Sequence, residues 1–242
     1  MAGPTRGSVQ QVGGARAVER LRRARHHRTV WGAALTATIA LGWPIIPVGA
    51  SAPSALFGGN LIANGDGELG DASPDGYSPV PVPGWTTTSN FTVVAYGTDG
   101  GYPSATDPGP SDRGANFFAG GPDNPSSSAS QLINVAAAAQ LIDSGAVAYD
   151  LSGYLGGWTD QDDNAVLQIT FKQGALVLGA AEIGPVTAAD RGDATGLLAR
   201  DTAGLVPVGT RQILVTLVMT KDPSVGTYND GYADDLRLVL SR

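Results

Sequence analysis

Hydrophobic and polar residues alternate in several short runs along the 242-residue chain. The clearest run is 164–172, where every second residue from Ala165 to Phe171 is apolar. A repeat of two places successive side chains on opposite faces, which is typical of a half-buried β-strand. Such patterns predict strands at 91–96, 116–120, 130–135, 146–155, 164–172, 211–219 and 228–240.

Helical patterns are scarce, because only AAAAQLID at 136–143 predicts a helix, of about two turns. Parallel strands need long crossover connections, which are usually helical. The sequence therefore predicts an all-β fold, an antiparallel β-sandwich (jelly roll) of about eight to ten strands with one short helix. We expect 110–130 to be a loop around one short strand and 190–200 to be a polar loop.

The first 50 residues differ in composition from the rest of the chain. A basic run at 20–28 precedes an apolar run at 29–43, and small residues follow at Val48 and Ala50. This order is typical of a secretory signal peptide cleaved after Ala50. A retained membrane anchor is the alternative, but fifteen residues are few for a span of about 20. The expected division is a signal peptide at 1–50, a short flexible segment at 51–59 and a secreted jelly-roll domain at 60–242.

Removal of the signal peptide makes the remaining chain strongly acidic. Residues 1–50 hold 7 Arg and 1 Glu, so 8 basic and 21 acidic residues remain, with a formal net charge of −13. Such a surface repels nucleic acid and anionic membranes and favours cations. Both histidines, His26 and His27, lie in the removed segment, and cysteine is absent. This excludes Ser-His-Asp and Cys-His catalysis and the usual zinc or copper sites, and leaves carboxylate chemistry and oxygen-bound Ca²⁺ or Mg²⁺.

Acidic residues occur near both ends of the predicted domain. Asp66 and Glu68 lie in NLIANGDGELG, and Asp234 and Asp235 lie in YNDGYADDLRLVL. A strict repeat of two places Asp234 on the apolar face of 236–240 and Asp235 on the outer face. Because the first and last strands of a sandwich can lie side by side, Glu68 and Asp234 would converge around a Ca²⁺. In the alternative, Asp234 caps a turn through backbone hydrogen bonds.

Three stretches carry a family resemblance, namely NLIANGDGE (60–68), PGW (83–85) and YADDLRLVL (232–240). They resemble carbohydrate-binding modules of the galactose-binding-like jelly-roll superfamily, in particular the family 4 and 9 type. The resemblance covers 60–240 in outline, and only its two ends are specific. It implies a structural Ca²⁺ between those ends, with Glu68 and Asp234 in the matching positions. The chain departs from the family at Gly67, where Phe is usual, so the local packing must differ.

One loop combines an aromatic residue with carboxylates, because Trp158 is followed by Asp160, Asp162 and Asn164. Trp stacks on the apolar face of a pyranose, and carboxylates accept hydrogen bonds from its hydroxyl groups. We therefore predict that these four residues bind a sugar. The alternative is that Trp158 packs onto the core.

Two arginines, Arg113 and Arg191, lie in polar stretches that we expect to rim the same binding surface. Arg191-Gly192-Asp193 spells an adhesion tripeptide, but a turn is its expected role. Three tyrosines are expected to pack inside the domain: Tyr96, Tyr102 and Tyr228.

These observations together predict a secreted, monomeric, non-catalytic binding module for carbohydrate or cell-surface glycan, with a structural Ca²⁺. No nucleic acid or membrane partner is expected after signal cleavage. One alternative is a structural or adhesive surface protein that binds another protein. A carboxylate-dependent glycoside hydrolase using Asp162, Asp163 and Glu182 is less favoured, because only two Glu follow residue 50.

Overall fold

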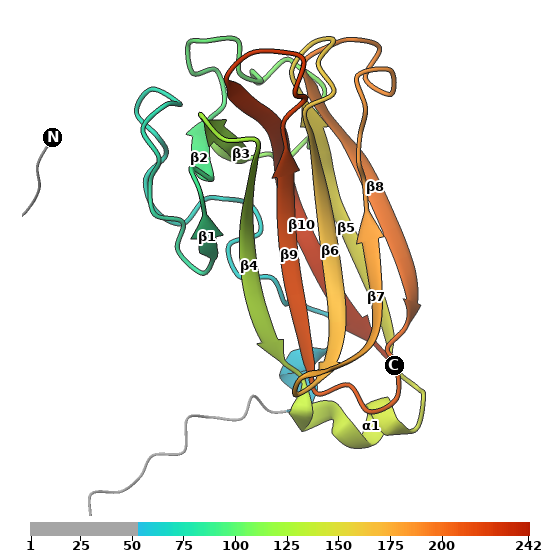
Figure 1. Ribbon diagram of the computed structural model, residues 1–242. Coiled ribbons are helices and arrows are strands. Elements are labelled where there is room, and N and C mark those ends of the chain that lie inside the picture. Colours follow the sequence, from blue (N-terminus) through green and yellow to red (C-terminus); the bar gives the residue numbers. More distant parts are fainter. Residues whose placement is uncertain (1–52) are drawn as a thin grey trace, which may run out of the picture. The chain divides into compact units, whose positions relative to one another are not determined.

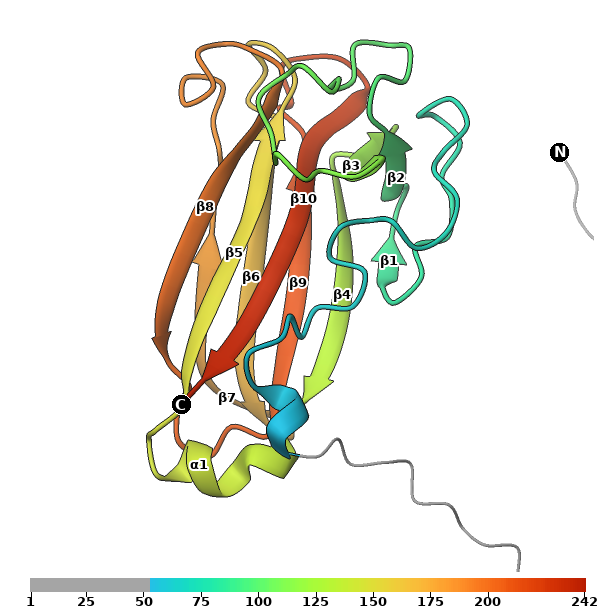
Figure 2. The same cartoon turned by 180° about the vertical axis from the view of Figure 1, so that it is seen from behind.

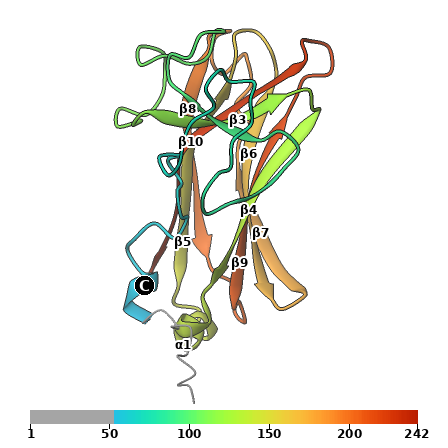
Figure 3. The same ribbon diagram turned by 90° about the vertical axis from the view of Figure 1, so that its left-hand side faces the viewer.

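Two five-stranded antiparallel sheets face each other in residues 53–242, the part of the chain that the computed structural model describes (Figure 1 and, edge-on, Figure 3). The signal peptide expected at 1–50 lies outside the described residues. No helix within 53–242 is both long enough and apolar enough to cross a bilayer. The predicted fold class, an antiparallel β-sandwich with one short helix, is confirmed.

The first sheet has the strand order β1-β4-β9-β6-β7. Its strands are β1 (Thr86–Thr88), β4 (Ser126–Asn134), β6 (Asn164–Gln173), β7 (Leu176–Ile183) and β9 (Gln212–Thr220). The second sheet has the order β2-β3-β10-β5-β8. Its strands are β2 (Thr92–Ala95), β3 (Asn116–Pro122), β5 (Ala148–Gly157), β8 (Gly196–Leu205) and β10 (Tyr228–Ser241). The short helical segments are η1 (Pro53–Leu56), η2 (Ala136–Ala138) and α1 (Ala139–Asp143).

Alternating apolar residues of both sheets form the core. Ile169 of β6 lies opposite Val215 of β9, and both are fully buried. From the facing sheet, Leu151 and Leu155 of β5 join the same core cluster. The period-two pattern thus has its expected cause, because each strand buries one face between the sheets.

One expectation about loops needs correction. The strand β8 begins at Gly196, so the second half of the expected loop 190–200 is extended and paired with β5. The flexibility expected of the segment 51–59 stays a prediction, although two of its residues contact the domain. Leu56 is buried in the core, and the Gly58 amide donates to the Leu240 carbonyl at 3.0 Å.

The two ends of the domain lie side by side, as predicted (Figure 2). The Leu61 amide donates to the Leu238 carbonyl at 2.8 Å. The Asn60 side chain donates to the Leu236 carbonyl at 2.9 Å and accepts from the Leu238 amide at 3.0 Å. This first segment therefore holds the second half of β10 along one edge.

A β-bulge in β10 overturns the predicted orientation of Asp234. Asp234 pairs with Tyr154 and Arg237 pairs with Ser152, so three steps on β10 match two on β5. The extra residue is Asp235, whose φ of 52° lies in the left-handed region. Asp234 consequently lies on the outer face of the sheet, opposite to the buried side chains of 236, 238 and 240. It is nevertheless fully buried, so other parts of the chain cover it.

The left-handed conformation at Asp235 predicts a difference between two uncharged substitutions. Asn tolerates positive φ, whereas the β-branched Val does not. We expect Asp235→Val to be less stable than Asp235→Asn by about 1–2 kcal/mol. Urea unfolding measures this as a lower midpoint with an unchanged slope. Equal midpoints for the two variants would contradict the bulge.

Candidate functional site

The outer face of the second sheet carries a second cluster of aromatic and apolar side chains. Its members are Val94, Tyr102, Phe117, Ala119, Leu197, Tyr228 and Tyr232. The connection between β2 and β3, 96–115, contributes Tyr102, whose ring centroid lies 5.5 Å from that of Tyr228 and 6.3 Å from that of Phe117. Such edge and tilted contacts between rings are favourable. The expectation that Tyr102 and Tyr228 pack inside is confirmed, because both are 7% exposed.

A pocket of about 150 Å³ opens beside this cluster. Its lining residues are Tyr77, Gly100, Tyr102, Trp158, Tyr228 and Asp230. They come from the loop before β1, from the 96–115 connection, from the end of β5 and from the start of β10. Four of the six lining residues are aromatic, and one is a carboxylate.

The aromatic residues of the pocket differ in exposure. The Tyr77 side chain is 56% exposed and meets Tyr228 edge-on, with ring centroids 5.2 Å apart. The Tyr228 hydroxyl donates to the Gly76 carbonyl at 2.8 Å, which fixes the ring. Trp158 is partly exposed. Tyr77 and Trp158 can therefore meet a ligand at the opening, while Tyr228 forms a rigid inner wall.

The Tyr102 hydroxyl is an unsatisfied polar group in this pocket. Burial raises the pKa of Tyr102 to about 12, so the hydroxyl keeps its proton at neutral pH. It lies near the Tyr228 hydroxyl but makes no hydrogen bond of normal geometry. A buried polar group without a partner costs about 1–3 kcal/mol.

Asp230 supplies the carboxylate of the pocket. Its Oδ1 accepts a hydrogen bond from the Tyr232 hydroxyl at 2.5 Å. Burial raises the pKa of Asp230 to about 6, although the Tyr232 bond acts in the opposite direction. The Asp230 backbone amide donates to Oδ2 of the buried Asp163 at 2.6 Å. Asp163 also accepts from the Asp222 amide at 2.5 Å, so it holds the start of β10 in place.

Trp158 is the one predicted ligand-binding residue that lines this pocket. Asp160 is exposed and accepts from the Thr159 hydroxyl at 3.2 Å. Asp162 accepts from the Ala188 amide at 3.0 Å, and the Asn164 side chain donates to the Asp162 carbonyl at 2.9 Å. These bonds shape the loop after β5. A ligand role for these three residues stays a prediction.

Arg113 organises the 96–115 connection. Its guanidinium donates to the carbonyls of Pro110, Ser104 and Asp107 at 2.8–3.0 Å. It also lies over the Tyr96 ring, 5.1 Å from the centroid. Three of its N–H groups are thus engaged within the loop, and Arg113 does not line the pocket. Its predicted ligand role stays a prediction.

Arg191 is similarly engaged, and it is only 8% exposed. Its guanidinium donates to four backbone carbonyls, those of Ala194, Val186, Thr159 and Gln161. It therefore connects the β5–β6 loop with the β7–β8 loop. A buried arginine cannot be offered to an adhesion receptor, so 191–193 has the expected role of a turn.

The acidic residues predicted to hold Ca²⁺ lie near one another at the bulge. Asp234 accepts from the Tyr96 hydroxyl at 2.7 Å and from the Asp235 amide at 2.7 Å. Glu68 accepts from the Ala115 and Asn116 amides at 2.7 and 2.8 Å. Burial raises the pKa of Asp234 to about 8, and the charges of Asp235 and Glu68 raise it further.

Further carboxylates lie around Asp234 and Glu68. Burial raises the pKa of Asp235, and the charges of Asp112 and Asp66 act in the same direction. Asp66 is exposed, and its Oδ1 accepts from the Glu68 amide at 3.3 Å. Within 53–242, however, no three acidic side chains are already arranged as a set of metal ligands.

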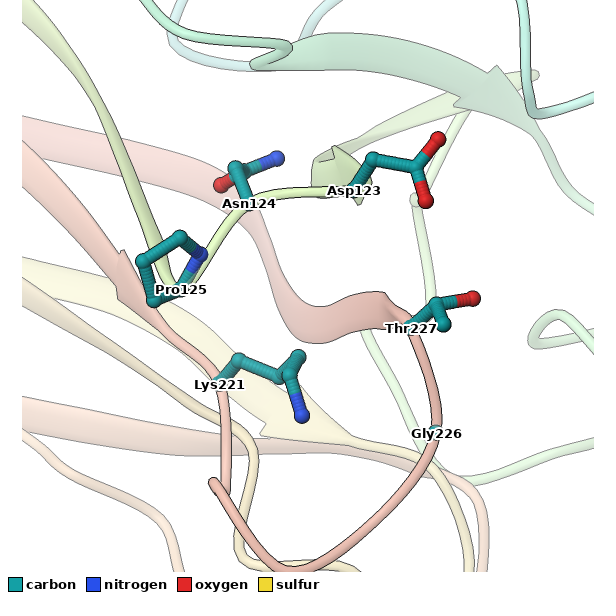
Figure 4. A pocket seen from close by; sticks show the side chains of 6 residues that line it. All are labelled: Asp123, Asn124, Pro125, Lys221, Gly226 and Thr227. Carbon is teal, nitrogen blue, oxygen red and sulfur yellow. The ribbon is translucent and has the colours of Figure 1, made fainter.

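A second pocket, of about 330 Å³, is shown in Figure 4. Its lining residues are Asp123, Asn124, Pro125, Lys221, Gly226 and Thr227. The Lys221 side chain points into the β9–β10 loop and donates to the Asp222 and Val225 carbonyls. No aromatic residue lines this pocket, so it lacks a stacking surface for a sugar.

Sequence reasoning did not identify Tyr77 and Asp230. Tyr77 lies in the turn SPDGYS, and Asp230 lies in YNDGY, where it resembles an ordinary turn carboxylate. The sequence does place Tyr77 directly after Asp75-Gly76 and Asp230 directly before Gly231-Tyr232, which indicates a turn near each residue. That signal does not show that the two residues face the same pocket.

The comparisons with known proteins are limited to similarities of structure. No protein-family model matches the chain, and no curated protein matches it by sequence. A Family 16 Carbohydrate Binding Module-2 structure has a TM-score of 0.42 and 16% identity, over 74% of this chain and 99% of that one. The CBM22-2 xylan-binding domain from Paenibacillus barcinonensis Xyn10C has a TM-score of 0.39 and 9% identity, over 74% and 96%.

Tailspike protein 4 of Bacteriophage CBA120 has a TM-score of 0.46 and 14% identity. The match covers 75% of this chain and only 21% of the tailspike chain. At these scores the similarities assign no ligand and no activity to this chain. The resemblance to the family 4 and 9 type stays a prediction.

The raised pKa of Asp230 predicts how stability depends on pH. The folded state holds the proton more tightly than the unfolded state, so stability is lost as pH rises from about 4 to about 6. Asp230→Asn removes this loss. Because the side chain is partly exposed, we expect the variant to gain about 1–2 kcal/mol relative to wild type across this window. Urea unfolding of both proteins at several pH values measures the difference, and parallel pH profiles would contradict it.

Proposed function

We propose that the chain is a secreted, non-catalytic module that binds carbohydrate. The observation that carries this proposal is the pocket formed by Tyr77, Tyr102, Trp158, Tyr228 and Asp230. Partly exposed aromatic rings stack on the apolar faces of sugars, and a few fixed polar groups hold the hydroxyls. The Asp230 carboxylate provides such a group. Secretion rests on the composition of residues 1–50.

The arrangement of carboxylates supports a binding role over hydrolysis. Glycoside hydrolases use two carboxyl groups about 5–10 Å apart that flank the bond to be broken. Asp230 is the single carboxylate in the pocket wall. The neighbouring Asp163 is fully buried, and both its oxygens accept backbone hydrogen bonds. Glu182 lies on β7, bonded to Gln168 at 3.0 Å, and does not line the pocket.

A structural Ca²⁺ between the two ends of the domain belongs to the same proposal. Its support is chemical, because the charges of Glu68 and Asp235 act on the buried Asp234 carboxylate. The chain has no His or Cys after residue 50, so the predicted ligands Asp66, Glu68 and Asp234 offer the hard oxygen donors that Ca²⁺ prefers. A divalent cation would offset the repulsion among these carboxylates. The competing arrangement is a protonated Asp234 held by Tyr96.

The binding proposal predicts that Trp158→Ala loses retention in affinity gels that contain soluble polysaccharides. The wild type should be retarded by at least one polysaccharide of a broad panel. The variant should bind that polysaccharide about tenfold or more weakly, because the stacking surface is removed. Leu205→Ala is the matched control, since Leu205 is 68% exposed at the far end of β8.

Thermal unfolding must show that both variants fold. Loss of glycan binding by a folded Trp158→Ala protein distinguishes this proposal from a surface protein that recognises another protein. If no polysaccharide retards the wild type, the binding proposal is wrong. If wild type and Trp158→Ala are retarded equally, this pocket is not the binding site.

The calcium proposal predicts that EDTA lowers the melting temperature. An ion bound only to the folded state at 100 times its Kd stabilises it by about 2.7 kcal/mol, which corresponds to a shift of about 5–10 °C. Asp234→Asn should melt at the same temperature with and without EDTA. Asp150→Asn, a change of an exposed carboxylate on β5, should keep the wild-type shift. A wild-type melting curve that EDTA does not move would rule out the ion.

A further inference from the structure

The pocket beside Trp158 combines four aromatic rings with a carboxylate and contains no basic side chain. Lys221 is the cation whose charge reaches Asp230, and its ammonium group donates to the Asp222 and Val225 carbonyls. Asp163 and Asp230 together make the surroundings acidic. The Asp230 carboxylate therefore has a hydroxyl partner, Tyr232, but no positively charged partner in the pocket wall.

Aromatic faces attract positive charge, because the ring quadrupole is negative at its face. Proteins therefore bind ammonium groups in sites built from several aromatic rings, and each contact between the cation and a ring contributes about 0.5–2 kcal/mol. Tyr77, Tyr102, Trp158 and Tyr228 surround a space of about 150 Å³. This is below the roughly 300–1,000 Å³ of a pocket for a drug-sized ligand, so it admits one group of a glycan and not several sugar units.

We propose that this pocket selects glycans whose sugar units carry a free, positively charged amine, as in β-1,4-linked glucosamine. The inference rests on the proposed carbohydrate-binding function and names its substrate class. The ammonium group pairs with the Asp230 carboxylate and faces the rings of Tyr102 and Tyr228, while the sugar ring meets Trp158 and Tyr77 at the opening.

The charge of the ligand separates a free amine from its acetylated form. A protonated amine pairs with the Asp230 carboxylate in the pocket wall, whereas an N-acetyl group has no charge for Asp230.

The whole domain is acidic, and this requires a control. With a formal charge of −13 after residue 50, the surface attracts any polycation, and salt screens that attraction. Binding in the pocket is distinguished from this general attraction by two variants that each lose one negative charge, one inside the pocket and one outside it. Asp201 is exposed halfway along β8 and does not line the pocket. Asp201→Asn removes the same charge as Asp230→Asn.

The test is isothermal titration at pH 6.5 and physiological salt, where both the amine and Asp230 carry charge, with three oligosaccharide series of equal length, built from glucosamine, N-acetylglucosamine and glucose. We expect the wild type and Asp201→Asn to bind the glucosamine series at least tenfold more tightly than the two neutral series. Asp230→Asn should lose this preference while keeping its affinity for neutral sugars. Trp158→Ala should weaken all three series, because it removes the stacking surface and not the charge.

Equal affinity of the wild type for all three series would overturn the amine preference and leave the proposed function intact. A reduction of the preference by Asp201→Asn as large as that by Asp230→Asn would also overturn it, because the attraction would then belong to the general surface charge. Binding to none of the series, together with no retention on the polysaccharide panel, would overturn both proposals.

Discussion

The bulge at Asp235 is the constraint on which both the core and the pocket depend. After it, alternate residues of β10 from Leu236 to Leu240 face the other sheet and are fully buried. Before it, Asp234 and Tyr232 lie on the outer face, and Asp230 lines the pocket. Because side chains alternate strictly along a strand, one part would face the wrong side without the extra residue. The bulge thus separates the core-facing end of β10 from Tyr232 and Asp234 on the outer face, and the register shifts again between Asn229 and Tyr232, where the strand reaches the pocket.

The sequence predicted the strands in which apolar and polar residues alternate. It did not predict the exposed edge strand β8 or the bulge in β10. The strands β6 and β9 bury one face between the sheets, which produces a clear period of two. The strand β8 lies at an edge, and Ala199, Asp201 and Ala203 are exposed, so its sequence resembles a polar loop. The bulge was also hidden, because ADDL contains no Gly to indicate a positive φ. The period of two holds for 236–240, but it does not extend across Asp235 to Asp234.

The candidate site shows a similar division. Trp158 was identifiable because an aromatic residue among glycines and carboxylates has a recognisable chemistry. Tyr77 and Asp230 were not, because only the tertiary fold brings such distant segments together. For Arg113 and Arg191 the predicted ligand role is not tested, but the structure shows bonds that the sequence did not indicate. Their guanidinium groups meet backbone carbonyls that the loops present only once folded, and a sequence does not distinguish such an arginine from one that faces a ligand.

Two carboxylates of β10, the half-buried Asp230 and the fully buried Asp234, form no ion pair in the part of the chain that the structure describes. The ion pairs within 53–242, Arg200–Asp190 and Arg211–Asp143, lie elsewhere. Burial of an ionised carboxylate costs free energy, and both groups accordingly have raised pKa values. This cost weakens the folded state at neutral pH and is recovered when an external cation pairs with the charge. Any cation that binds at these two side chains would therefore also stabilise β10, which is the physical basis of both proposals.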